Sequence, residues 1–150
     1  MGYSEKYIED YFCDNIDKID DDLKFFRRQY IVNHKKKRVG IIDILCVQGE
    51  DKRYVIIENK KEKLKGRDIG QVLAYYKIFK NIDTIGSAKR RDPKIILICV
   101  DVDVQFELAY EVIAQLNIDL EVKTVKQASD GELYLVDFFD KDHTRFKITK

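Results

Sequence analysis

The sequence predicts an α/β protein that folds as one domain, and three observations support this prediction. Apolar residues recur at helical spacing in some segments and in short continuous runs in others. At 150 residues, the chain is long enough for one domain with a complete hydrophobic core. No internal repeat, low-complexity tract or long linker interrupts it, so we expect residues 1–150 to form one unit.

A helix is expected at the amino-terminal end, where Ser4 can cap a helix that begins at Glu5. On a helical wheel, Glu5 falls within the apolar face of this helix and Glu9 falls at its edge. A carboxylate that points towards a core is costly without a partner, so the position of Glu5 needs an explanation. The apolar face consists of Ile8, Tyr11, Phe12, Ile16 and Ile19.

Three strands are predicted after this helix, at residues 23–33, 40–48 and 53–60, because their apolar residues include many β-branched and aromatic types. The basic residues 34–38 are expected to form a loop between the first two strands. Residues 49–52, with the sequence Gly-Glu-Asp-Lys, are typical of a turn. The second and third strands are therefore predicted to form a hairpin.

Helices and strands are also expected in the remainder of the chain. After a basic loop at residues 61–67, Asp68 can cap a helix that runs to about Phe79. Residues 94–100 are almost continuously apolar, which is typical of a strand that is covered on both faces. The other expected elements are a helix at residues 106–116 and strands at residues 118–125 and 132–139, followed by a peripheral segment after Asp140.

Charge is segregated along the chain, although the net charge is only +1. Aspartates make residues 10–22 acidic, whereas lysine and arginine cluster at residues 34–38, 60–67 and 89–94. Local asymmetry of this kind can bind a polyanion even when the total charge is near zero. A single basic run, taken alone, is more often a solvated loop.

The sequence predicts a cytoplasmic protein without a membrane partner. No stretch approaches the ~20 apolar residues that a transmembrane helix needs. The acidic start lacks the basic and apolar progression of a secretory signal. Cys13, Cys46 and Cys99 lie far apart in apolar surroundings, which favours buried thiols in a reducing compartment over disulfides or a zinc site.

The hairpin register brings two acidic residues together. A two-residue turn and a four-residue turn give the same register, and both place Asp43 opposite Glu58. Opposed residues of an antiparallel pair have Cβ atoms ~5 Å apart. Lys60 lies two residues beyond Glu58, so period-two alternation places it on the same face. The alternation also places Ile42 beside Ile44 on the opposite face of the hairpin.

Two opposed carboxylates among apolar neighbours repel each other and lose hydration, and a divalent cation would relieve this cost. Two carboxylates and a backbone carbonyl suit Mg²⁺, and the carbonyl of Asn59 is well placed by sequence to be the third ligand. A metal beside the ammonium of Lys60 is an arrangement that cleaves phosphodiesters. The alternative is that Asp43 and Glu58 are edge residues and that Lys60 forms an ordinary salt bridge.

Five short motifs in this order resemble the PD-(D/E)xK nuclease superfamily, and most closely the catalytic domain of NucS-type and RecB-like endonucleases. The resemblance implies a restriction-endonuclease-like core, with a mixed central sheet flanked by helices on both faces. Ile42 replaces the proline that names the superfamily, and the separate amino-terminal domain of NucS-type proteins has no counterpart here. The motifs are Glu5-x-x-Ile8, Arg27-Arg28-Gln29-Tyr30, Gly40-Ile41-Ile42-Asp43-Ile44-Leu45, Val55-Ile56-Ile57-Glu58-Asn59-Lys60 and Gln71-x-x-x-Tyr75.

The resemblance also implies roles for individual residues. Asp43 and Glu58 would bind the metal, Lys60 would be the catalytic lysine, and Glu5 would complete the acidic site as a further catalytic residue and ligand. Gln71 and Tyr75, four residues apart on one helix face, would help to hold the substrate; taken alone, they fit a solvent-facing amide beside a core tyrosine. Further substrate contacts are expected from Arg27, Gln29, Lys35, Lys36, Lys63, Lys65 and Arg67.

The leading hypothesis is therefore a Mg²⁺- or Mn²⁺-dependent endonuclease that acts on DNA, with RNA as an alternative substrate. A homodimer would most easily cut two strands. A second hypothesis is a catalytically inactive nucleic-acid-binding module with the same fold. A third is a protein-interaction subunit, for which the acidic start would be the partner face.

Overall fold

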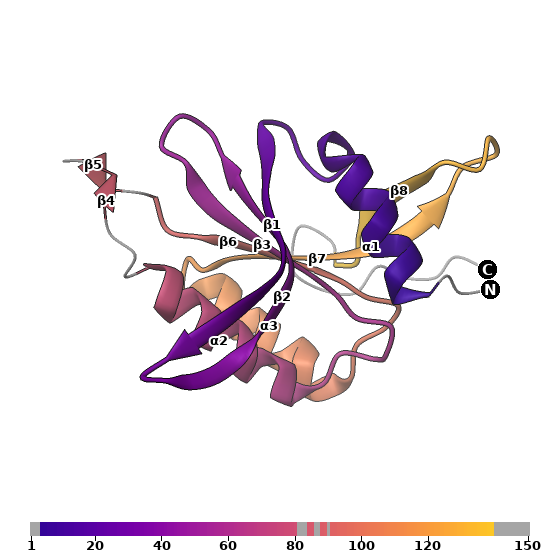
Figure 1. Ribbon diagram of the computed structural model, residues 1–150. Coiled ribbons are helices and arrows are strands. Elements are labelled where there is room, and N and C mark those ends of the chain that lie inside the picture. Colours follow the sequence, from indigo (N-terminus) through magenta and orange to yellow (C-terminus); the bar gives the residue numbers. More distant parts are fainter. Residues whose placement is uncertain (1–3, 81–83, 86–87, 90, 140–150) are drawn as a thin grey trace.

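The fold is built on a six-stranded mixed sheet with the strand order β1-β2-β3-β6-β7-β8 (Figure 1). The computed structural model describes residues 4–80, 84–85, 88–89 and 91–139. β6 is parallel to both of its neighbours, and the other neighbouring strands are antiparallel. The strands of this sheet are β1 (Leu23–His34), β2 (Lys37–Gln48), β3 (Arg53–Asn59), β6 (Lys94–Ile98), β7 (Asp119–Gln127) and β8 (Leu133–Asp137), while β4 (Thr84–Ile85) and β5 (Ala88–Lys89) pair separately.

Helices cover both faces of the sheet. α1 (Glu5–Asp14) lies on one face, and α2 (Gly66–Lys80) and α3 (Val104–Gln115) lie on the other (Figure 1). A short 3-10 helix, η1 (Ile16–Lys18), follows α1. The prediction of an α/β fold with a mixed central sheet and helices on both faces is confirmed. Among the described residues, no helix is both long and apolar enough to cross a membrane.

Capping side chains explain where the helices begin. The Ser4 hydroxyl accepts a hydrogen bond from a backbone N–H in the first turn of α1 (3.0 Å), as predicted. α3 begins before the predicted position, because the Asp103 carboxylate caps it in the same way (2.8 Å). α2 also begins earlier, at Gly66, so Asp68 lies in its first turn rather than ahead of it.

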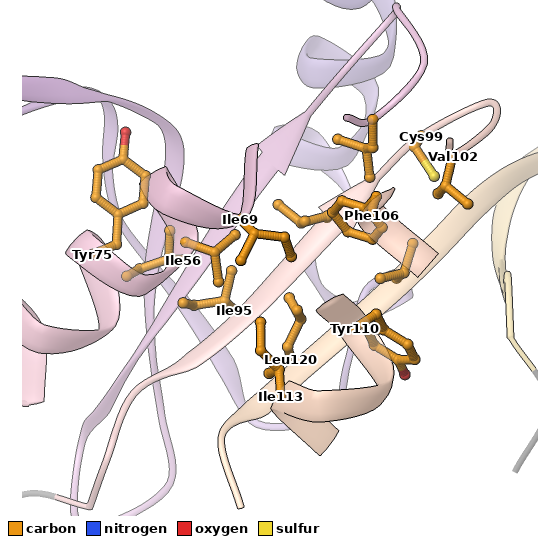
Figure 2. Packing of buried hydrophobic residues seen from close by; sticks show 14 of the residues in the cluster. Ile56, Ile69, Tyr75, Ile95, Cys99, Val102, Phe106, Tyr110, Ile113 and Leu120 are labelled. Atoms are coloured by element: carbon orange, nitrogen blue, oxygen red, sulfur yellow. The ribbon is translucent and has the colours of Figure 1, made fainter. Parts of the chain in front are cut away.

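Two apolar clusters on opposite faces hold the sheet between the helices. Beneath α2 and α3, Ile56 and Ile95 of the sheet pack with Phe106 of α3 (Figure 2). On the other face, Phe12 of α1 packs in a second cluster with Ile57. Every residue of β6 is buried, which confirms the prediction of a strand covered on both faces. β3 and β6 therefore form a rigid centre for the sheet.

The basic run at residues 34–38 is not the predicted loop. β1 continues to His34 and β2 begins at Lys37, so only Lys35 and Lys36 form the turn. Both have positive φ angles, 50° and 65°, which a tight two-residue hairpin turn requires. These lysines therefore lie at the tip of a long hairpin rather than in a loop.

The regular alternation of side chains is interrupted beside Asp43. Gln29 in β1 has a φ of 52°, in the left-handed region, and it lies opposite Asp43 in the register of the two strands. Ile42 packs in the same cluster as Leu45, whereas Ile44 packs on the opposite face. The predicted placement of Ile42 beside Ile44 is wrong, because a two-residue period holds only in an uninterrupted strand.

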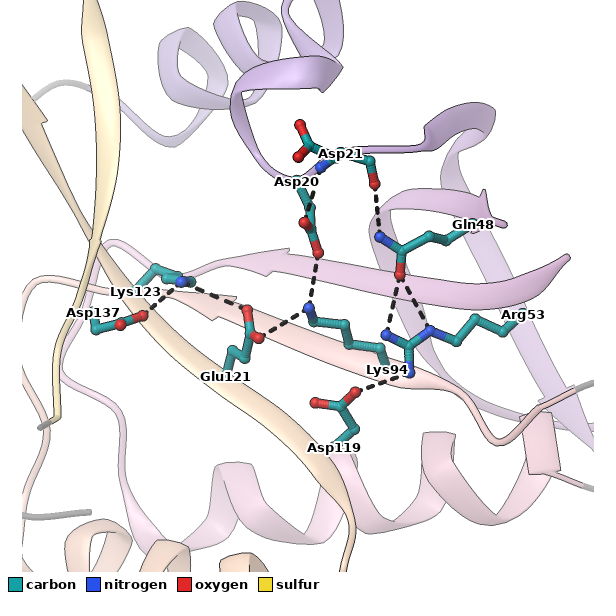
Figure 3. Close-up of polar contacts among 9 residues, drawn as sticks. All are labelled: Asp20, Asp21, Gln48, Arg53, Lys94, Asp119, Glu121, Lys123 and Asp137. Carbon is teal, nitrogen blue, oxygen red and sulfur yellow. Dashed lines mark hydrogen bonds and ion pairs between the residues drawn. The ribbon is translucent and has the colours of Figure 1, made fainter. Parts of the chain in front are cut away.

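A buried ion-pair network closes one end of the sheet (Figure 3). The ammonium of Lys94, at the start of β6, lies 2.8 Å from an Asp20 oxygen and 2.9 Å from a Glu121 oxygen. The neighbouring Arg53 guanidinium pairs with Asp119 at 2.8 Å. Lys94 belongs to the third predicted basic cluster, so part of that cluster binds the protein's own carboxylates. Arg90 of the same cluster lies outside the described residues.

Replacing Lys94 with alanine is expected to destabilise the fold, because Asp20 and Glu121 would lose the cation between them. Both carboxylates keep some contact with solvent, so we expect a loss of about 2 kcal/mol, below the range for a fully buried pair. Urea denaturation of the variant measures this loss. Lys24→Ala, at an exposed position on β1, is the control, and an equal loss in both variants would contradict the assignment.

Candidate active site

The predicted hairpin register is present in the structure. Gln48 lies opposite Arg53, and Ile44 lies opposite Ile57. One step further along, the Asp43 amide donates a hydrogen bond to Glu58 Oε1 (3.0 Å). The amide of Asn59 in turn donates to Asp43 Oδ2 (2.7 Å). These two bonds hold the carboxylates of Asp43 and Glu58 side by side on neighbouring strands.

The paired carboxylates are poorly hydrated. Glu58 is only 3% exposed to solvent. Its burial, reinforced by the charge of Asp43, raises the pKa of Glu58 to about 8. Burial likewise raises the pKa of Asp43, although the hydrogen bond from Asn59 opposes this effect. The pair therefore favours a cation or a shared proton between its two members.

Lys60 places an ammonium beside this pair. Its Nζ lies 3.5 Å from Glu58 Oε2, and its side chain is partly exposed. Its backbone amide donates to the Ile98 carbonyl (2.7 Å), which fixes the chain where β3 leaves the sheet next to β6. The predicted proximity of Lys60 to Glu58 is present, and the ammonium can reach both the carboxylate and the solvent.

α1 brings two acidic groups to this region, the predicted Glu5 and also Glu9. Glu9 is only 9% exposed, whereas Glu5 is exposed, so the predicted burial of Glu5 is wrong. Glu9 is buried because Arg28 and Gln29 of β1 cover it: Gln29 Nε2 donates to its Oε1 (2.8 Å), and the Arg28 guanidinium binds its Oε2. A helical wheel contains no information about a strand that packs over the helix edge.

Glu5 instead fastens the loop after β3 to the start of α1. Its carboxylate accepts a hydrogen bond from the Lys61 amide (3.0 Å). Its backbone carbonyl accepts one from the side-chain amide of Asn59 (3.0 Å). Glu5 therefore contacts the residues on either side of Lys60, and together with Glu9 it contributes negative charge near Asp43.

These residues surround a hollow of about 480 Å³, which we call the acidic hollow. Arg28 also lines this hollow and is not among the predicted substrate contacts, because the sequence does not indicate whether Arg27 or Arg28 faces inward. The left-handed backbone of Gln29 interrupts the alternation of side chains in β1, and no sequence motif predicts that conformation. The lining residues are Glu5, Lys6, Glu9, Arg28, Gln29, Asp43 and Asn59.

The residues at this site supply some, but not all, of the ligands that a hard divalent cation such as Mg²⁺ needs. Carboxylate oxygens are the ligands that Mg²⁺ prefers, and it fills its remaining positions with water. Asp43 and Glu58 supply two such groups, and the raised pKa of Glu58 reflects its burial beside the charge of Asp43, which Lys60 opposes only in part. Among residues 4–80, 84–85, 88–89 and 91–139, no three His, Cys, Asp or Glu side chains are grouped as a metal site. The role of the Asn59 carbonyl as a third metal ligand stays a prediction.

Gln71 and Tyr75 of α2 approach the site from the other face. A Cβ atom at Gly40 would clash with the Tyr75 hydroxyl and lie 2.7 Å from Gln71 Nε2. The Tyr75 hydroxyl is buried and has no hydrogen-bond partner in the described part of the chain. Figure 2 shows it pointing away from the apolar cluster. Burial, together with the charges of Glu58 and Asp43, raises the pKa of Tyr75.

The other predicted substrate contacts are divided between two regions. Lys63 and Arg67 line a hollow of about 280 Å³, the loop hollow, together with Glu5, Lys60 and Lys61. Lys65 is exposed in the same loop. Lys35 and Lys36 lie at the hairpin tip, which the rise per residue places roughly 20 Å from Asp43. The Arg27 guanidinium stacks on the Phe26 ring at 4.5 Å and lines neither hollow.

Comparison with known proteins supports the fold but not these roles. No family model matches the sequence, and no curated protein matches it. A repair endonuclease from Pyrococcus abyssi is 19% identical, with a TM-score of 0.57 over 80% of this chain and 46% of that one. An EndoMS complex with double-stranded DNA is 16% identical, with a TM-score of 0.58 over 81% of this chain and 46% of that one.

The apo form of EndoMS gives a similar match, with 16% identity and a TM-score of 0.54 over 80% of this chain. The chain thus spans about half the length of the endonuclease chains that it matches. It has their NucS-like, restriction-endonuclease-like fold, and the predicted resemblance is confirmed at that level.

Glu58→Gln is expected to stabilise the metal-free protein at alkaline pH. The pKa of Glu58, about 8, lies above its ordinary value of 4.5, so the charged form costs folding stability as the pH rises between these values. Glutamine keeps the shape without the charge. At about pH 9 we expect a gain of at least about 1 kcal/mol, or about 2–4 °C in Tm, that shrinks towards about pH 5.

Thermal denaturation in EDTA at several pH values measures this difference. Glu50→Gln, at an exposed position in the turn after β2, is the matched control. A loss of stability in Glu58→Gln that is equal at all pH values would contradict the assigned burial of a charge.

Gly40→Ala is expected to cost about 1–3 kcal/mol, because the added methyl group overlaps the Tyr75 hydroxyl. The cost should fall when Tyr75→Phe is combined with it, since the hydroxyl in contact is then absent. Tyr75→Phe alone should be neutral or stabilising, because this hydroxyl has no partner among the described residues. Urea denaturation of the two single variants and the double variant tests this coupling, and additive effects would contradict it.

Proposed function

We propose that the protein is a divalent-metal-dependent endonuclease that hydrolyses phosphodiester bonds of DNA. The observation that carries this proposal is the pair of opposed carboxylates, half-buried Asp43 and buried Glu58, beside an open hollow. Two adjacent carboxylates with little hydration are costly, and groups perturbed in this way cluster at functional sites. The likeness of the fold to a repair endonuclease and to EndoMS in complex with double-stranded DNA supports DNA as the substrate class.

Asp43 and Glu58 would hold Mg²⁺ or Mn²⁺, with the Asn59 carbonyl as a further ligand. When bound, the cation would polarise the scissile phosphate and make a nearby water molecule more acidic. The chain's own contribution is to fix both carboxylates through backbone hydrogen bonds, so that little reorganisation accompanies the reaction. Glu5, whose position is set by Lys61 and Asn59, would add negative charge at the edge of the site.

Lys60 would act on the phosphate and on the attacking water. Its ammonium lies at hydrogen-bonding reach of solvent and 3.5 Å from Glu58 Oε2. From there the ammonium can orient the water and balance the negative charge that develops on the phosphate, whereas the neutral amine, after losing a proton, could accept one from the water. The anchored backbone of Lys60 keeps the ammonium close to the carboxylates.

Substrate phosphates would be held by the cations around the two hollows. Arg28 is fixed by Glu9 and Asp10, so it presents a guanidinium of restricted motion to the acidic hollow. Lys63 and Arg67 would contact the strand beyond Lys60 in the loop hollow. Gln29, Gln71 and Tyr75 would supply neutral contacts near the scissile group, whereas Lys35 and Lys36 would contact only a long substrate.

A catalytically inactive nucleic-acid-binding module is the second candidate. The observation in its favour is that the described residues contain no group of three acidic or imidazole ligands, and that both carboxylates already accept backbone hydrogen bonds. In such a module, the cations would bind phosphates and no bond would be cleaved.

A cleavage assay with labelled single-stranded, duplex and flap DNA in Mg²⁺ or Mn²⁺ separates the two candidates. We expect Asp43→Asn, Glu58→Gln and Lys60→Ala to lower the rate by at least about 100-fold each, as the loss of essential catalytic groups does. Asp14→Asn, at the exposed end of α1, should retain the wild-type rate. Calorimetric titration with Mn²⁺ should show binding that is lost in Asp43→Asn.

Full cleavage in EDTA, or full activity in the three variants, would contradict the proposed mechanism. DNA binding without metal binding and without cleavage would favour the inactive module.

A further inference from the structure

A hollow of about 310 Å³ lies between the hairpin of β1 and β2 and the second half of α2 (Figure 1). We call it the hairpin groove. It is lined by His34 and Val39 of the hairpin and by Ala74, Lys77 and Ile78 of α2. Val39 and Ile78 pack against the apolar cluster beneath α2 and keep part of their surface exposed. The floor of the groove is therefore an open, aliphatic extension of the core.

A β-bulge directs Val39 into this groove. Val32 pairs with Gly40, and Asn33 pairs with Arg38, so Val39 is an extra residue in β2. In an uninterrupted strand, neighbouring side chains such as those at positions 39 and 40 point to opposite faces. Bulges change the direction of a side chain in this way, and they are frequent beside functional sites. The bulge thus brings an apolar side chain to α2 that regular pairing would have turned away.

The rim of the groove is cationic and has no carboxylate in either wall. Lys77 lines the groove, and Lys37 lies opposite His34 in the register of the hairpin, which places it on the same face. Both lysines are exposed, and neither forms an ion pair with a carboxylate of the described residues. The sequences of the two walls, residues 29–42 and 69–80, contain neither Asp nor Glu. A surface of this kind attracts an acidic partner.

An aliphatic floor within a cationic rim fits an acidic amphipathic helix. Ala74 and Ile78 lie one turn apart on α2, so they form a ridge against which a second helix can pack its apolar side chains. DNA fits this groove less well, because its phosphates would contact the lysines and leave the floor in water. Proteins that bind unstacked bases stack them on aromatic rings, whereas the floor here consists of valine, alanine and isoleucine.

We propose that the hairpin groove docks an acidic amphipathic helix of a partner protein. The helix places aliphatic side chains over Val39, Ala74 and Ile78, and its carboxylates pair with Lys37 and Lys77. The acidic hollow is lined from α1, on the other face of the sheet, so the docked helix leaves it open. The partner can thereby position the protein without occupying the candidate active site. Docking of this kind goes beyond the proposed nuclease activity and does not depend on it.

A fluorescent peptide with leucines at helical spacing among glutamates is the probe, and anisotropy measures its Kd for the full chain. In a second peptide serine replaces leucine, and in a third lysine replaces glutamate. We expect the wild type to bind the first peptide and to bind the serine peptide at least about tenfold more weakly, because the apolar contacts are lost. The lysine peptide should show no binding, and the affinity for the first peptide should fall as the salt concentration rises.

Two substitutions test the groove itself. Ala74→Glu places a carboxylate in the floor and should weaken binding of the leucine–glutamate peptide at least about tenfold. Lys77→Glu reverses a charge of the exposed rim and should weaken it about three- to tenfold. The matched controls are Ala114→Glu, half-buried on α3, and Lys24→Glu, exposed on β1, and both should bind like the wild type. Melting temperatures show whether each variant folds, and Lys77→Glu alone still decides the test if Ala74→Glu does not.

Failure of the wild type to bind the leucine–glutamate peptide, or equal binding of the serine peptide, would overturn the docking site. Displacement of the bound peptide by duplex DNA in EDTA would assign the groove to nucleic acid and overturn it as well. Light scattering covers a second copy as the occupant: a dimer that Ala74→Glu dissociates would contradict the proposal.

DNA cleavage in Mg²⁺ or Mn²⁺ is measured in parallel, and the groove variants should cleave at the wild-type rate. If the wild type cleaves DNA but does not bind the peptide, the docking site is wrong and the nuclease function stands. If the wild type binds the peptide through the groove but cleaves no DNA, the proposed function fails and the docking site stands.

Discussion

Asp43 and Glu58 are held side by side because the turn between β2 and β3 fixes the register of two buried strands. Their mutual repulsion opposes this arrangement, so the rest of the fold has to outweigh it. Apolar clusters on both faces pack against β3, and β6 pairs with its other edge, so local unfolding cannot easily move the two carboxylates apart. The stability of the central sheet is therefore what makes the charged site possible.

Charged side chains are fully paired at one end of the sheet and only partly paired at the other. At one end, Lys94 lies between two carboxylates, and the network around it is satisfied (Figure 3). At the other end, Glu58 has a raised pKa, the Tyr75 hydroxyl has no partner among the described residues, and lysines gather around hollows. Proteins relax the rule of polar satisfaction mainly where a ligand completes it. The contrast within a single sheet supports the view that this second end is the functional one.

Local sequence signals predicted much of this arrangement. The cap at Ser4, the buried β6 and the register that opposes Asp43 and Glu58 all depend on residues near one another in the chain, and they are present. The errors arise where distant segments decide. Gln29 adopts a left-handed conformation between the residues that pair with Ile42 and Ile44, and these two isoleucines lie on opposite faces of the sheet. In the same way, Glu9 rather than Glu5 is buried, because β1 packs over α1.

The exposed position of Glu5 explains more than its predicted burial would have done. Glu5 belongs to the lining of the acidic hollow, of the loop hollow and of a third hollow of about 220 Å³ that Lys60 also lines, so it stands where all three meet. By accepting a hydrogen bond from the Lys61 amide, it holds the chain directly after Lys60, where β3 has ended. A buried carboxylate could serve one pocket only. An exposed one at the start of α1 adds negative charge between the proposed metal site and the lysines of the loop hollow, which disfavours a phosphate bound directly across the carboxylates.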